Sequence, residues 1–93
     1  MISERVREVL MAAAMSGKKQ VTGVYFMGDA VCALGALYEA MPQELQQWPR
    51  REVRHCILAG YDITLQDMNR ISTLNDAGYD FLTIARKLED GNG

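Results

Sequence analysis

One stretch of the chain, residues 30–38, carries no polar side chain. A helix without a polar face belongs inside a protein, because it offers nothing to water. The pattern therefore predicts a central buried helix over about 29–41, capped by Asp29 and ended by Pro42. Gly35 falls inside this helix, where a glycine costs about 1 kcal/mol relative to alanine. We expect another segment of backbone to pass close to it.

Apolar residues at helical spacing on both sides of this stretch predict further helices. They run from about Glu4 to Ser16, from Pro49 to Gly60, from Thr64 to Gly78 and from Asp80 to about Leu88. Ser3, Thr64 with Asp67, and Asp80 have the chemistry of N-terminal caps. The residues expected to face the core are Val6, Val9, Leu10, Val53, Cys56, Ile57, Gly60, Leu65, Met68, Ile71, Leu74, Phe81, Ile84, Ala85 and Leu88.

Residues 20–27 have a different pattern, because β-branched and aromatic residues dominate them. This composition predicts extended chain. The segment fits a small hairpin that turns at Thr22 and Gly23. It fits equally a loop held in place by Tyr25 and Phe26, whose rings reach the core.

The predicted fold class is all-α, with four main helices around a central apolar helix (about 29–41) and a short extended arm or mini-hairpin at about 20–27. A length of 93 residues fits one small helical domain, 1–93, with 90–93 as a frayed tail. No stretch approaches the roughly 20 apolar residues of a membrane span, and no secretory signal pattern is present. We therefore expect a cytoplasmic protein. A net charge of −2 gives no global attraction to nucleic acid or to anionic lipid.

The two cysteines, Cys32 and Cys56, are too few for a disulfide framework or a four-ligand zinc site. Apolar neighbours favour reduced, buried thiols. A cysteine-dependent enzyme is an alternative, because the first turn of the predicted central helix would lower the pKa of Cys32. Its base would have to be His55, the single histidine, which falls on a polar helix face. We expect no enzyme, no cofactor and no metal.

The polar face of the predicted third helix is rich in arginine, and a tryptophan precedes it. Arginine and tryptophan are typical anchors of protein interfaces. We therefore expect a small protein-binding module, and its partner-binding residues are Trp48, Arg50, Arg51, Arg54 and His55. The same arginines also suit phosphate or a solvated surface, and Trp48 equally suits the core. Self-association through Met41, Leu45 and Trp48 is a further alternative.

The C-terminal half carries a partial DNA-binding pattern at 64–89. Its apolar residues have the spacing of the first two helices of a helix-turn-helix, namely Ile71, Leu74, Gly78, Ile84, Ala85 and Leu88. In that family a recognition helix follows, and only five residues follow Leu88 here. A DNA-binding or transcription-associated protein is therefore an alternative that we favour less.

The run Cys32-Ala33-Leu34-Gly35-Ala36, with Asn75-Asp76 downstream, resembles a family of small uncharacterised bacterial and phage proteins. The resemblance covers about 23–88 and is specific only in these two motifs. Val24-Tyr25 departs from it, because a tryptophan is common there. The resemblance supports the fold and implies no activity. A phage-type accessory or inhibitor that docks on a larger host protein is the most concrete form of the expected module.

Overall fold

The computed structural model describes residues 4–42 and 53–89. This part of the chain is all-α with one short hairpin, which confirms the predicted fold class. Its five helices and two strands are α1 (Glu4–Met15), β1 (Phe26–Met27), β2 (Ala30–Val31), α2 (Ala33–Glu39), α3 (Val53–Tyr61), α4 (Leu65–Asp76) and α5 (Phe81–Glu89).

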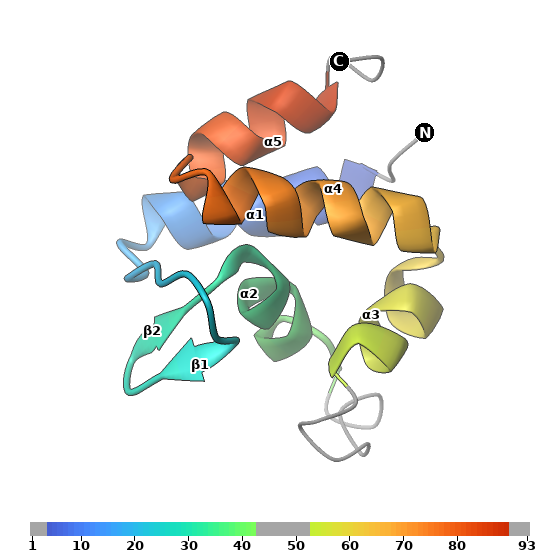
Figure 1. Ribbon diagram of the computed structural model, residues 1–93, viewed down its shortest axis with the longest axis horizontal. Coiled ribbons are helices and arrows are strands. Elements are labelled where there is room, and N and C mark those ends of the chain that lie inside the picture. The colour runs from blue at the N-terminus through green and yellow to red at the C-terminus, as the bar shows by residue number, and fades with distance from the viewer. Residues whose placement is uncertain (1–3, 43–52, 90–93) are drawn as a thin grey trace.

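The short helix α2 is the centre of the fold. Every residue from 31 to 38 is buried, and α2 packs against α1, α3 and α4. In Figure 1, α5 lies on one side of α1 and α4, and α2 lies on the other. The predicted buried central helix is therefore confirmed, although the helix is shorter than the predicted 29–41.

Gly35 allows a close approach of backbone to α2, as the sequence predicts. A Cβ atom at this position would lie 2.3 Å from the carbonyl oxygen of Tyr25. Real Cβ atoms essentially never come so close to an oxygen. The missing side chain therefore lets the segment that precedes β1, residues 20–25, lie directly against the central helix. We call this segment the arm.

The hairpin lies further along the chain than the sequence analysis placed it. Phe26 pairs with Val31 and Met27 with Ala30, so the turn is at Gly28-Asp29, not at Thr22-Gly23. Gly28 has a φ of +59°, which a glycine adopts without strain.

The predicted Asp29 cap is wrong, because this residue belongs to the hairpin turn. Cys32 caps α2 instead, and its Sγ accepts a hydrogen bond from the N–H of Gly35 at 3.4 Å. The apolar run 30–38 is thus split between a strand and a helix. A run of this kind is uniform in polarity, so its periodicity does not reveal the division.

The helices α4 and α5 begin where their capping residues predict. Thr64 and Asp67 form a reciprocal capping box at the start of α4. Asp80 caps α5 by accepting a hydrogen bond from the N–H of Thr83 at 2.8 Å. The apolar residues of α5 that were expected to face the core are all buried: Phe81, Ile84, Ala85 and Leu88.

Two predicted core positions are wrong. Leu65 is 57% exposed, because it is the first residue of α4 and the buried face of this helix starts at Met68. Gly60 is exposed and does not end α3, which continues through it to Tyr61. Asp62, with a φ of +54°, follows the helix.

Several predicted features lie outside the described residues, namely Ser3, Leu45, Trp48, Pro49, Arg50, Arg51 and the tail 90–93. Met41 is described and is 6% exposed, so it belongs to the core and not to a surface for self-association. None of the helices in the described part has the length and apolar character that a bilayer span requires.

Candidate functional site

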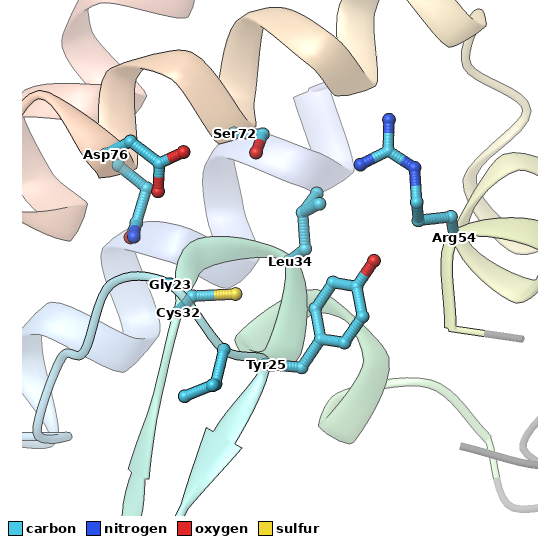
Figure 2. Close-up of a pocket in the computed structure, with 9 residues that line it drawn as sticks. Gly23, Tyr25, Cys32, Leu34, Arg54, Ser72 and Asp76 are labelled. Carbon is cyan, nitrogen blue, oxygen red and sulfur yellow. The ribbon is translucent and has the colours of Figure 1, made fainter. Parts of the chain in front are cut away.

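A pocket of ≈ 440 Å³ lies where the arm before the hairpin, the start of α2, α3 and α4 meet (Figure 2). Pockets that bind small groups commonly have volumes of this order. The pocket combines one cation, one anion, a thiol and hydroxyl groups with an apolar wall. The described residues that line it are Gly23, Val24, Tyr25, Cys32, Leu34, Arg54, Ser72, Asn75 and Asp76.

Asn75 fixes the walls of this pocket relative to one another. This residue is 2% exposed, and its Oδ1 accepts hydrogen bonds from the N–H of Ala33 at 3.0 Å and from Nε2 of Gln20 at 2.8 Å. Its Nδ2 donates to the carbonyl oxygen of Val21 at 3.0 Å. One buried amide thus ties the arm and the first turn of α2 to α4. Both ends of the amide are used, so the group is satisfied despite its burial.

Cys32 presents a protonated thiol to the pocket. Burial raises the pKa of this thiol, and this effect exceeds the lowering by the hydrogen bond from the Gly35 N–H. The nearby charge of Asp76 raises it further. The start of the helix lowers the pKa of Cys32 as expected, but burial outweighs this lowering, so the net shift is upward and opposite to the one that a nucleophile needs. His55 is exposed on α3 and is not among the described lining residues, so no imidazole faces the thiol there.

The two charges of the pocket come from different helices. Arg54 belongs to α3, and its guanidinium donates a hydrogen bond to Oδ1 of Asn69 on α4, which holds it in place. Asp76 lies at the exposed end of α4. Figure 2 shows Arg54 on one side of the pocket and Asp76, near Cys32, on the other. Within the described residues neither side chain forms an ion pair.

A second hollow, of ≈ 360 Å³, lies between α1 and the end of α2. Small side chains such as Ala13 and Ala36 form most of its surface. Its two charged residues, Lys18 and Glu39, form an ion pair with each other at 3.1 Å. Since these two charges pair with each other, this hollow is a weaker candidate for binding a charged ligand than the pocket beside Cys32.

The structure divides the predicted partner-binding set. Arg54 is half-buried and lines the pocket, whereas His55, the next residue, is exposed. Trp48, Arg50 and Arg51 lie outside the described residues. Sequence reasoning therefore identified one lining residue, Arg54, on the correct helix but assigned it to an outer face.

Sequence reasoning considered Cys32 only as a buried thiol or a nucleophile and missed the other polar lining residues, although the expected family resemblance had singled out Asn75-Asp76. Its two motifs, Cys32–Ala36 and Asn75-Asp76, are far apart in the sequence. The structure brings them together, because Asn75 accepts the hydrogen bond from the N–H of Ala33. Cys32, Asn75 and Asp76 then line the same pocket.

Comparison of the chain with protein-family models, with curated proteins and with solved structures gave no match. The described residues include no group of three or more His, Cys, Asp or Glu side chains that could hold a metal ion.

Proposed function

We propose that this chain is a non-enzymatic protein-binding module that takes a group of a partner protein into the pocket between Arg54 and Asp76. The supporting observation is that this pocket holds a charge of each sign, and neither charge has an ion-pair partner within the described residues. Complementary charges on a partner give an interface its specificity and its rate of association. In its most concrete form the module is a cytoplasmic, phage-type accessory or inhibitor that docks on a larger host protein.

The chemistry of Cys32 favours binding over catalysis. A nucleophilic cysteine acts as a thiolate, and its environment usually lowers its pKa. Here burial raises the pKa of Cys32, and the described lining residues supply no imidazole to remove its proton. The thiol is instead used as a structural cap for α2.

The nucleic-acid alternative has one structural feature in its favour, since α4 and α5 form the predicted hairpin around Gly78. The exposed side of α5 carries Leu82, Arg86 and Glu89, which include one base and one acid. DNA-binding surfaces need several cations to attract phosphates. Salt-dependent retention of the purified protein on DNA would favour this alternative over the protein-binding proposal.

The proposal is tested by partner capture with charge-reversed variants. The tagged protein is incubated with cell lysate, and the retained proteins are identified by mass spectrometry. We expect Arg54→Glu to lose a protein that the wild type retains, because it turns the only cation among the described lining residues into an anion. Arg86→Glu on the exposed side of α5 is the matched control and should retain this protein.

Thermal melting of each variant separates a loss of binding from a loss of fold. Retention of every wild-type partner by a folded Arg54→Glu variant would contradict the proposal. A double variant, Arg50→Glu with Arg51→Glu, completes the experiment. If this variant alone lost the partner, the arginines that precede α3 would form the binding surface in place of the pocket.

A further inference from the structure

The charges in the pocket specify the kind of group that it accepts. Figure 2 shows the guanidinium of Arg54 and the carboxylate of Asp76 on opposite sides, with Leu34 and the hydroxyl of Ser72 between them. Leu34 is 2% exposed, and the ring of Tyr25 adds to the apolar wall. The pocket is therefore positive at one end, negative at the other and partly apolar in between.

A ligand with a single charge fits this arrangement poorly. A carboxylate at Arg54 brings no partner for Asp76, and a monoamine at Asp76 brings none for Arg54. Either ligand therefore leaves one charge of the pocket without a counter-charge. A ligand that carries both charges satisfies both ends, and a short methylene chain between them suits the apolar wall.

We propose that the pocket binds a dipolar group in which a carboxylate and an ammonium are joined by a short aliphatic chain. The carboxylate lies against Arg54, the ammonium against Asp76, and the chain against Leu34. This inference rests on the proposed function for the position of the binding site and adds the chemical class of what enters it. A polypeptide that ends in lysine and a free amino acid share this chemistry.

The inference is tested with three six-carbon ligands that differ only in charge: 6-aminohexanoate, hexanoate and hexylamine. Each is titrated into ¹⁵N-labelled wild-type protein while the amide NMR signals are followed. We expect 6-aminohexanoate to shift the amides of Cys32, Ser72 and Asp76. Its Kd should be lower than that of either singly charged ligand by about threefold or more, the size expected for partly exposed ion pairs.

Two charge-neutral variants assign the ends of the ligand. In Arg54→Gln, 6-aminohexanoate should bind no better than hexylamine, because only the ammonium end retains its partner. In Asp76→Asn, it should bind no better than hexanoate. Arg86→Gln and Asp62→Asn are the matched controls at exposed positions and should leave all three Kd values unchanged.

Two ligands distinguish the sources of the dipolar group. Nα-acetyl-lysine imitates a lysine at the end of a polypeptide, and free lysine carries the same carboxylate, chain and ε-ammonium with an uncapped α-amino group. Stronger binding of Nα-acetyl-lysine supports a protein terminus, whereas stronger binding of free lysine supports a free amino acid.

Equal Kd values for the three six-carbon ligands, or no shift of pocket amides with 6-aminohexanoate, would overturn the inference. Both outcomes are measured on the wild-type protein, so neither depends on whether a variant folds. If these results occur while Arg54→Glu still loses its captured protein, the proposed function stands without this ligand chemistry. If 6-aminohexanoate binds as expected while Arg54→Glu captures normally, the pocket takes a free small molecule and the protein-binding proposal fails.

Discussion

At the scale of single residues, two positions set the geometry of the pocket. Gly35 lets the arm that contains Tyr25 lie against α2, and Asn75 ties the arm and α2 to α4. The close approach at Gly35 could be predicted, because a glycine inside an apolar helix needs a packing reason. The role of Asn75 could not, because an asparagine near a helix end usually caps its own helix. Asn75 instead accepts a hydrogen bond from the N–H of Ala33, which lies 42 residues away at the start of α2.

Gly35→Ala should destabilise the protein. The added Cβ would meet the carbonyl oxygen of Tyr25 at 2.3 Å, and backbone does not yield as a flexible side chain does. Overpacking of this kind costs about 1–3 kcal/mol. Urea unfolding measures the change in free energy. Gly60→Ala, at an exposed position inside α3, is the control and should be neutral or stabilise by up to about 1 kcal/mol. Equal stability of the two variants would show that the contact at Gly35 is absent.

Asn75→Leu should cost more than an ordinary surface change. It keeps a side chain of similar size but leaves the N–H of Ala33, the amide of Gln20 and the carbonyl of Val21 without this partner. A buried polar group without a hydrogen bond costs about 1–3 kcal/mol, so a loss of about 2–4 kcal/mol is expected. The free energy of unfolding measures it.

Asn69→Leu is the control for the asparagine substitution. Asn69 is exposed on the same helix, and its side chain accepts a hydrogen bond only from Arg54 among the described residues. This variant should stay within about 1 kcal/mol of the wild type. If both asparagine variants lowered the free energy of unfolding by the same small amount, the hydrogen bonds of Asn75 would not hold the elements together.

At the scale of elements, the sequence predicted accurately where helices with strong capping residues begin. It did not reveal how the apolar run 30–38 divides into a strand and a helix. The capping box at Thr64 and the cap at Asp80 sit where they were expected. Asp29 has the same chemistry, and it precedes an apolar run as a cap would. The pairing of Phe26 with Val31 places Asp29 in the hairpin turn instead. Strand pairing depends on a partner segment, so a local signal cannot reveal which role an aspartate takes.

The cap at Asp80 should make α5 sensitive to acid. Hydrogen bonds from the side chain and the backbone N–H of Thr83 lower the pKa of the Asp80 carboxyl. A pKa that is lower in the folded state gives stability above the unfolded-state value of about 4, and this stability is lost as the pH falls through the folded-state pKa. Thermal melts at several pH values between 7 and 2 should show this loss.

Asp80→Asn is the control, because it keeps an acceptor for the cap and removes the charge. It should lose less stability than the wild type as the pH falls below about 4. Asp80→Ala should lose about 1 kcal/mol near neutral pH, because it removes the cap altogether. Identical pH profiles for the wild type and Asp80→Asn would show that the carboxylate does not stabilise the helix through its charge.

At the scale of the whole molecule, the fold could be predicted much further than the site. Helical periodicity identified the all-α class and the buried position of the central helix, because each depends on local pattern. The pocket depends on the meeting of α3, α4, the start of α2 and the arm before the hairpin. No periodicity within one element reports that Arg54 and Asp76 face the same space. The predicted arginine surface therefore contained one described residue that lines the pocket, Arg54, but the prediction had placed this residue on an outer helix face.

The central claim is that the partner enters this pocket, and filling the pocket tests it most directly. Ser72 is half-buried on α4 and lines the pocket, whereas the next residue, Thr73, is exposed. Adjacent helical residues point about 100° apart, so Ser72→Trp fills the pocket and Thr73→Trp adds the same ring outside it. The measurement is capture of the wild-type partner by both variants at equal folded concentration. We predict that Thr73→Trp retains the partner and Ser72→Trp loses it. Equal retention by both variants would contradict the claim.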